Sequence, residues 1–265
     1  MPKRQIALAL QDLSEGTRNW RIWYVLGISD VRQRYRRSLL GPFWITLSIG
    51  IQTLVMGLLL SYLFRIDLHR YFPFLCMGIV IWNFISSTIN EGANCFILTG
   101  PVILQVKRPL WTYMMQTLWR NVINFGHTVI VFVVVAAIFR IVPSVNYVVA
   151  PVGLVLLATN LAWMSLAAGL LSVRFRDLPM LIQTALPLLV WLTPVFYHPD
   201  QLGPTTRMII ELNPLTHMVE IARAPFLNQM PAFSSWLAAV GVGFFGWLMT
   251  FALFVRVRAR VPFWV

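Results

Sequence analysis

Uncharged apolar segments of about 20 residues recur along the whole chain. Folded as an α-helix, a segment of that length can cross the hydrocarbon core of a lipid bilayer, which is about 30 Å thick. Only 11% of the 265 residues are charged, compared with about 25% in an ordinary globular protein. The chain is therefore predicted to be an all-α integral membrane protein without a separate soluble catalytic domain.

Six segments are expected to cross the membrane, in a single transmembrane domain that covers residues 1–265. They run from about Phe43 to Phe64, Tyr71 to Asn90, Tyr113 to Phe139, Tyr147 to Val173, Leu178 to Tyr197 and Phe233 to Val255. Residues 1–42 form an amphipathic N-terminal segment, residues 43–255 the six-span bundle and residues 256–265 a tail. No apolar stretch in residues 1–42 is long enough for a signal peptide, so the first span is expected to stay in the mature chain.

Lysine and arginine are divided unevenly between the two sets of loops. Of the 21 basic residues, 16 lie before the first span, in or near the connections after the second and fourth spans, or in the tail. Because basic residues favour the cytoplasmic side of short loops, both termini are expected to be cytoplasmic. The net charge is +12, and the spread of the basic residues between apolar segments favours lipid headgroups over nucleic acid as partners.

Residues 19–40 combine an apolar face with a cluster of arginines. The apolar face consists of Trp20, Tyr24, Ile28, Val31 and Tyr35, and the arginine cluster of Arg32, Arg34, Arg36 and Arg37. The pattern is typical of a helix that lies in the headgroup plane, and Gly41-Pro42 allows a turn into the first span. Two interpretations stay open: a plain positive-inside anchor with no partner, or an interface helix that also contacts a partner.

The connection from Glu91 to Pro109 is unusually apolar for a solvated loop. Pro101 can begin a new short helix there, with Val102, Ile103 and Val106 on one side. An exposed apolar element of this kind predicts a docked partner. The alternative is that the second and third spans extend beyond the bilayer and pack against each other.

The connection formed by residues 198–231 is too long and too apolar for a plain turn. Asn213-Pro214 predicts two short helices that meet at an N-cap, and Arg207 with Glu211 and Glu220 with Arg223 are at spacings that allow ion pairs. The segment is expected to be a re-entrant or outer helical hairpin that lines or closes an exit. An amphipathic cap resting on the outer leaflet is the alternative.

Two spans carry polar or helix-weakening residues on one side. The set in the second span is Asn83, Ser87, Asn90 and Asn94, and the set in the fifth is Gln183, Pro187, Trp191 and Pro194. Polar residues in a span must face protein or water, so the first set predicts either interhelical hydrogen bonds or the wall of a hydrophilic conduit. The second set predicts a kinked pore helix, although packing alone also explains it.

The sequence offers no residues for catalysis or metal binding. Lys3 and Lys107 are the only lysines and neither follows a glycine, so a phosphate-binding loop of the G-x-x-x-x-G-K-[ST] type is absent. The four histidines show no metal-ligand spacing, and no acidic residue falls in the middle of a predicted span to carry protons or sodium. Transport would therefore need an outside source of energy.

Four stretches resemble, in order and spacing, the membrane (permease) subunit of bacterial ABC exporters of surface polysaccharide such as O-antigen, capsule or teichoic acid. They are residues 32–44 (RQRYRRSLLGPFW), residues 174–177 (RFRD), residues 193–197 (TPVFY), and Asn213-Pro214 followed by Glu220 and Arg223. Ile49 stands where many relatives carry a proline, which bears on the bend of the first helix.

The resemblance implies a permease subunit in the bacterial inner membrane. It would form a homodimer, with a channel for a lipid-linked glycan at the dimer interface and two ATP-binding cassette subunits beneath it. ATP and Mg would bind to those partners, and this chain would hold no cofactor. An ABC exporter of a small hydrophobic drug or lipid shares the topology and is the alternative, and a membrane glycosyltransferase or acyltransferase is a remote one.

The resemblance also assigns roles to stretches of this chain. The residues that would contact the ATPase subunit are Asn94, Gly100, Pro101, Val102, Ile103, Lys107 and Arg108. Those of the interface helix and of substrate access are Trp20, Arg32, Arg34, Tyr35, Arg36 and Arg37. Those of the channel and outer gate are Asn83, Ser87, Asn90, Gln183, Trp191, Pro194, Tyr197, Asn213, Glu220 and Arg223.

Overall fold

The computed structural model describes residues 2–36, 38–41 and 43–265, so Arg37 and Pro42 lie outside the described residues. Every regular element within these ranges is a helix, which confirms the all-α prediction. The longer helices are α3 (Phe43–Phe64), α4 (Leu68–Leu98), α6 (Leu110–Ile138), α7 (Ala150–Ser172) and α11 (Phe233–Val257). Among the described residues these five, α7 extended by η1 (Val145–Val149), are long and apolar enough to cross a membrane.

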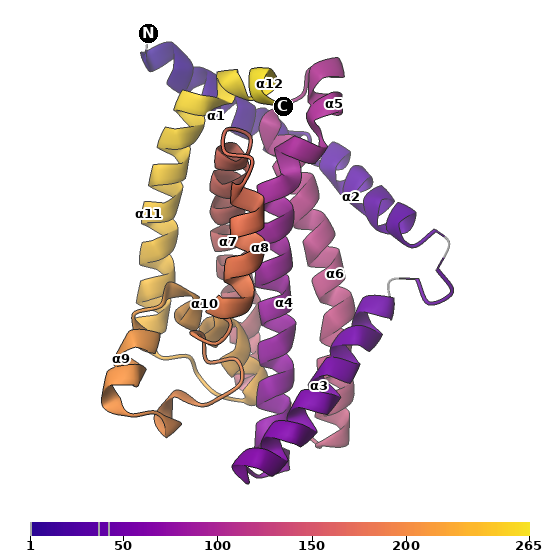
Figure 1. Cartoon of the computed structure of the whole chain (residues 1–265), viewed down its shortest axis with the longest axis vertical. Coiled ribbons are helices and arrows are strands. Elements are labelled where there is room, and N and C mark those ends of the chain that lie inside the picture. Colours follow the sequence, from indigo (N-terminus) through magenta and orange to yellow (C-terminus); the bar gives the residue numbers. More distant parts are fainter. Residues whose placement is uncertain (1, 37, 42) are drawn as a thin grey trace.

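Shorter helices lie at the two ends and along the sides of the bundle. They are α1 (Pro2–Arg18), α2 (Trp20–Arg34), α5 (Gly100–Gln105), α8 (Leu178–Leu189), η2 (Pro199–Gln201), α9 (Pro204–Glu211), α10 (Pro214–Arg223), η3 (Ala224–Leu227), η4 (Arg258–Arg260) and α12 (Val261–Trp264). Both chain termini, α1, α5 and α12 lie at one end, which we call the terminal end (Figure 1). We call the opposite end, near the start of α4, the far end.

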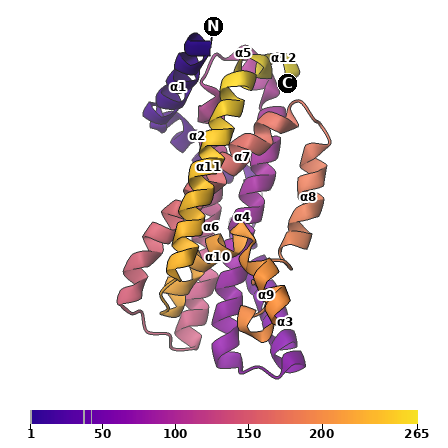
Figure 2. The same ribbon diagram turned by 90° about the vertical axis from the view of Figure 1, so that its left-hand side faces the viewer.

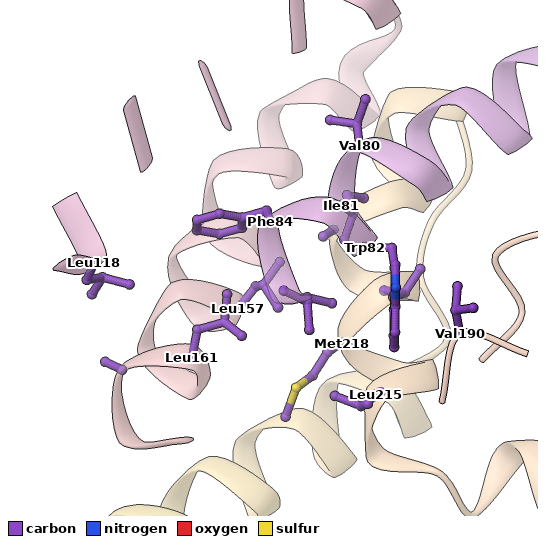
Figure 3. Packing of buried hydrophobic residues seen from close by; sticks show 14 of the residues in the cluster. Val80, Ile81, Trp82, Phe84, Leu118, Leu157, Leu161, Val190, Leu215 and Met218 are labelled. Carbon is purple, nitrogen blue, oxygen red and sulfur yellow. The ribbon is translucent and has the colours of Figure 1, made fainter. Parts of the chain in front are cut away.

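Helix α4 is the centre of the bundle, enclosed mainly by α6 and α7. Figure 3 shows its side chains Ile81 and Phe84 packed among Leu157 and Leu161 of α7 and Met218 of α10. Gly92 of α4 allows α4 and α7 to approach closely, because a Cβ atom at this position would lie 2.3 Å from Cβ of Ser165 on α7. Small residues at such crossings allow close packing of membrane helices.

The predicted fifth span is only partly helical. Helix α8 has 12 residues and ends at Leu189, although it was expected to continue to Tyr197. Twelve helical residues cover about 18 Å, which is short of the bilayer core. After Leu189, the N–H groups of Trp191, Leu192 and Thr193 donate to carbonyl oxygens three positions back, so the chain leaves the helix in a series of turns. Pro194 has no N–H and cannot resume the helix. A sixth crossing stays a prediction, and Figure 2 shows α8 standing beside the rest of the bundle.

The predicted second span was too short. Helix α4 continues from Asn90 to Leu98, and α6 already begins at Leu110. The two helices thus extend further than expected and pack on each other, as one of the two interpretations of this connection proposed. Only Thr99 separates the end of α4 from the short helix α5, which begins at Gly100.

Candidate transport groove and its two ends

A groove with both polar and apolar side chains in its walls runs along α4 beside α8. It consists of two cavities of about 500 and 380 Å³ that share Asn90 and Gln183 in their walls. The lining extends along α4 from Ile79 to Thr99, a helical distance of about 30 Å. That distance is close to the thickness of a bilayer core. We call this feature the transport groove.

The polar stripe predicted on the second span lies largely in this groove. Asn83 lines the cavity nearer the far end, Asn94 lines the cavity nearer the terminal end, and Asn90 lines both. Ser87 is half-buried outside the lining, and its hydroxyl donates to the carbonyl oxygen of Phe84 at 3.3 Å. Three of the four side chains thus line a cavity, and their role as the wall of a conduit stays a prediction.

A network of charged side chains, absent from our sequence predictions, joins three helices at the wall of the groove. Glu91 of α4 accepts from Arg34 of α2 at 2.9 Å and from Arg120 of α6 at 2.8 Å. Arg120 also pairs with Asp30 of α2 at 2.7 Å. Glu91 was assigned to a loop because α4 was predicted to end at Asn90. Asp30 and Arg34 are four positions apart, which places them on the same face of α2. This spacing could have indicated that the face carries charged side chains that pair with other helices.

Helix α2 packs against α6 and slopes away from the terminal end (Figure 1). Gly27 and Val31 are buried against the bundle, and a Cβ atom at Gly27 would lie 2.9 Å from Trp119 Cδ1. Tyr24 also contacts Trp119, with 5.3 Å between ring centroids. The helix axis is therefore fixed by a close contact with α6.

The predicted interface residues have unequal surroundings. Trp20 is half exposed, and Tyr35 is half-buried just beyond the end of α2. Arg32 and Arg36 are exposed, whereas Arg34 contacts Glu91. Arg37 lies outside the described residues. The predicted apolar face is thus only partly buried, because Val31 contacts the bundle and Trp20 does not.

The terminal end presents exposed apolar side chains on α5. Val102 and Leu104 are exposed, and Ile103 is half-buried, so the predicted face of Val102, Ile103 and Val106 is not uniformly exposed. Pro101 begins the helix as expected, and Gly100 lies against Val265. The remaining predicted contact residues, Lys107 and Arg108, follow the helix and line a cavity of about 430 Å³ together with Ile103.

Asp12 of α1 holds this end together, a role that our sequence analysis did not predict. Its carboxylate accepts from the backbone N–H groups of Leu110 and Trp111 at 3.2 and 3.1 Å, and so caps the start of α6. Arg258 donates to the same carboxylate at 2.8 Å. The cap comes from a distant helix, so no local motif indicates it.

Two short helices, α9 and α10, meet at Asn213 as the sequence predicts. We call this pair the hairpin, and its place at the outer side of a membrane stays a prediction. Asn213 is the N-cap, as expected, and its Oδ1 accepts from the N–H of Leu215 at 3.0 Å. Arg207 and Glu211 form the predicted ion pair at 2.7 Å. The pair expected between Glu220 and Arg223 does not form.

Glu220 and Arg223 bind other partners instead. Glu220 accepts from the hydroxyl of Ser235 at 2.7 Å, at the start of α11. Arg223 is buried and donates from Nη1 to the carbonyl oxygen of Pro194 at 2.7 Å. The prediction failed because the two side chains leave α10 toward different neighbouring segments. Burial lowers the pKa of Arg223 to about 9.

The segment after α8 is held by further hydrogen bonds to the hairpin. Asn213 Nδ2 donates to the carbonyl oxygen of Leu192 at 3.0 Å. The Tyr197 hydroxyl donates to the carbonyl oxygen of Trp191 at 2.7 Å, and the Trp191 ring is mostly exposed. The predicted gate residues thus gather around the turn that ends α8. No group of three histidine, cysteine or acidic side chains suited to a metal ion occurs in the described ranges.

Residues 22–227 match the model of the family described as ABC-2 type transporter. Relatives include two proteins from Klebsiella pneumoniae named O-antigen export system permease protein RfbA. One is 24% identical over 77% of this chain and 79% of the relative, and the other is 21% identical over 89% and 92%. A protein of the same name from Myxococcus xanthus is 23% identical over 76% of this chain and 78% of its own length. This multi-pass membrane protein belongs to the ABC-2 type transporter family.

Proposed function

We propose that the chain is the permease subunit of an ATP-driven exporter that moves a lipid-linked, O-antigen-like polysaccharide across the bacterial inner membrane. The observation that carries the proposal is the transport groove, which places Asn83, Asn90, Asn94 and Gln183 along an otherwise apolar bundle. Amide side chains both donate and accept hydrogen bonds, which suits hydrated sugar hydroxyls. The names of the relatives supply the class of cargo.

A groove for a small hydrophobic drug would be lined mainly by apolar and aromatic side chains. The cavity nearer the terminal end instead carries Glu91, Asp30, Arg34 and Arg120 in its wall. The cavity nearer the far end is lined mostly by apolar side chains, so it is the charged part of the groove that supports a polysaccharide over the alternative of a drug or lipid.

A second copy of the chain is proposed to pair through α8. In one copy α8 leaves apolar side chains exposed, among them Leu181, Leu188 and, just beyond the helix, Trp191. Leu181 and Leu188 lie on the face of α8 that is turned away from the groove lining, so pairing of two copies there would bury this apolar face. A cysteine at Leu188 should form an intermolecular crosslink, whereas one at Val240, an exposed position of α11, should not. Crosslinking at Val240 alone would contradict this arrangement.

The terminal end is proposed to face the cytoplasm and to bind two ATP-binding cassette subunits. The exposed apolar side chains of α5 support a docking role. ATP and Mg would bind to those subunits, and this chain would hold no cofactor of its own. The hairpin of α9 and α10 would form the outer gate.

Substituting the arginines near the end of α2 tests whether they only anchor the chain to the membrane or also bind the phosphates of the substrate. Lysine keeps the charge but cannot reproduce the two-pronged hydrogen bonding of arginine to phosphate. Export should fall in at least one of the variants Arg32→Lys, Arg34→Lys, Arg36→Lys and Arg37→Lys. Normal export by all four, at normal abundance, would leave the cluster as an anchor.

The decisive experiment expresses the chain with its ATPase partner in a bacterium that makes lipid-linked O-antigen but lacks its own exporter. Surface polysaccharide should appear with the wild type and fall sharply with Asn90→Leu, while Val240→Leu, outside the groove, should match the wild type. Drug efflux without surface polysaccharide would favour the alternative exporter. Glycan or acyl transfer by the purified chain alone would favour an enzyme.

A further inference from the structure

A second groove, separate from the transport groove, lies between α7 and α11. Its volume is about 750 Å³, and no charged side chain lines it. Trp163, Ala167 and Leu171 of α7 form one wall, and α11 forms the other, with Gly241 and Gly246 in the lining. We call this feature the lateral groove. It shares no lining residue with the transport groove.

Two glycines of α11 shape the lateral groove. A Cβ atom at Gly241 would meet no heavy atom within 4 Å, so the hollow opens at this position. A Cβ atom at Gly246 would lie 2.2 Å from Cε2 of Trp163, so the indole rests directly against the α11 backbone. The lateral groove is therefore an open hollow with a tryptophan in its wall. A larger side chain at Gly241 would fill it.

Two arginines lie at the terminal end of the lateral groove. Arg256 follows the lining residue Leu253 by three positions, which keeps it on the same face of α11 about 4.5 Å further along the axis. Arg174 follows Leu171 by three positions, just beyond α7. Both are exposed, and neither forms an ion pair with a carboxylate in the described part of the chain. The guanidinium of Arg174 lies 5.6 Å from the ring of Trp264.

We propose that the lateral groove binds an anionic phospholipid, with one acyl chain between α7 and α11 and the phosphate at Arg256 and Arg174. The apolar lining fits the chain, and the two free cations fit the headgroup. A zwitterionic lipid fits the groove equally well but carries no net charge to attract the arginines. Because the two grooves are separate, this lipid is a resident ligand and not the cargo.

The test places the full chain in nanodiscs that contain phosphatidylcholine and phosphatidylglycerol with a photoreactive group on one acyl chain. Crosslinks mapped by mass spectrometry should concentrate on residues 163–171 and 238–253. Unlabelled phosphatidylglycerol should compete better than phosphatidylcholine, by about fivefold for each arginine.

Two variants separate the chain contact from the headgroup contact. Gly241→Leu should abolish the crosslinks, whereas Val240→Leu, on the adjacent exposed face, should keep them. Arg256→Gln should retain the crosslink positions but lower the preference for phosphatidylglycerol about fivefold, and Arg260→Gln should leave it unchanged. Since Arg256 is exposed, this variant decides the question even where Gly241→Leu does not fold.

Three results would overturn the proposal. Crosslinks spread equally over α3 and α11 would mean unspecific contact with the surrounding lipid. An unchanged preference in both Arg256→Gln and Arg174→Gln would remove the headgroup contact. Crosslinks between the α11 helices of two copies, in place of lipid crosslinks, would mean that another protein chain occupies the groove.

Discussion

The guanidinium carbon of Arg223 lies 3.8 Å from the centroid of the Phe74 ring. His198 stacks on the same ring, with 3.8 Å between centroids, and Arg223 also donates to the carbonyl oxygen of Pro194. One aromatic ring of α4 thus contacts both α10 and the segment that follows α8. The proposed outer gate is therefore attached to the central helix at this point.

Replacing Phe74 should loosen this attachment. Phe74→Leu keeps an apolar side chain but loses the cation–π contact, so the free energy of unfolding should fall by about 2 kcal/mol. Phe72→Leu is the matched control, since Phe72 is also buried and stacks on Phe139, with no cation over its ring among the described residues. Its loss should be about 1 kcal/mol. Thermal unfolding of the purified protein compares the two, and equal losses would contradict a special role for the Arg223 contact.

The stack should also respond to pH. Burial, with a second contribution from the positive charge of Arg223, lowers the pKa of His198 below 6.5, while Asp200 opposes the shift. The unfolded chain therefore binds a proton at a higher pH than the folded chain, so stability falls as the pH drops below about 6.5. Hydrogen exchange of residues 194–203 should be faster at pH 5.5 than at pH 7.5. His198→Gln should remove most of this difference and His69→Gln should keep it.

Removing Glu91 should weaken the hold of the bundle on α2. Glu91→Gln leaves Arg34 and Arg120 without their shared carboxylate, and breaking a largely buried pair costs about 3 kcal/mol. Hydrogen exchange in residues 20–34 should accelerate and the unfolding temperature should fall. Glu15→Gln, at an exposed position of α1, should change stability by less than about 0.5 kcal/mol. An unchanged exchange rate in α2 would show that its other contacts, including the pair of Asp30 and Arg120, are sufficient to hold it.

Docking of the ATPase partner should depend on α5. Val102→Asp places a charge on an exposed side chain, so the chain should still insert and fold, but burial of an unpaired carboxylate at the interface should abolish stimulated ATP hydrolysis. Val142→Asp, exposed on a connection at the far end, should leave hydrolysis unchanged. Normal stimulation and export by Val102→Asp would mean that α5 does not contact the partner.

Topology is tested by labelling single cysteines. Reagents added from outside should reach cysteines at Asp67 and Asp200 and fail to reach those at Lys107 and Asp177. The native thiols of Cys76 and Cys95 are buried, which keeps the background low. The opposite labelling pattern would place the termini outside.

The apolar segments predicted most of the helices because length and hydropathy alone decide what can cross a bilayer. The first span, from Phe43 to Phe64, has the predicted bounds. The expected helix could not reach Tyr197, because Pro194 cannot continue it. It ends earlier, at Leu189, and Asn213 and Arg223 bind carbonyl groups of the turns that follow. Hydropathy averages over such a turn and does not detect it.

The groove-lining residues that could be predicted from the sequence are those that lie on one face of a single helix. Asn83, Asn90 and Asn94 form a stripe that helical spacing makes visible. The charged network was missed because Asp30, Glu91 and Arg120 come from three helices, and only folding brings them together. The expected pair of Glu220 and Arg223 failed for the opposite reason, because close spacing on α10 did not outweigh partners from other segments.

The carboxylate of Asp12 and the guanidinium of Arg258 are separated by 246 positions in the chain. During synthesis, Asp12 therefore leaves the ribosome long before the arginine that pairs with it, and also before the start of α6 that it caps. The terminal end becomes complete only when nearly the whole bundle has been inserted. A chain arrested before α11 would therefore leave Asp12 without Arg258.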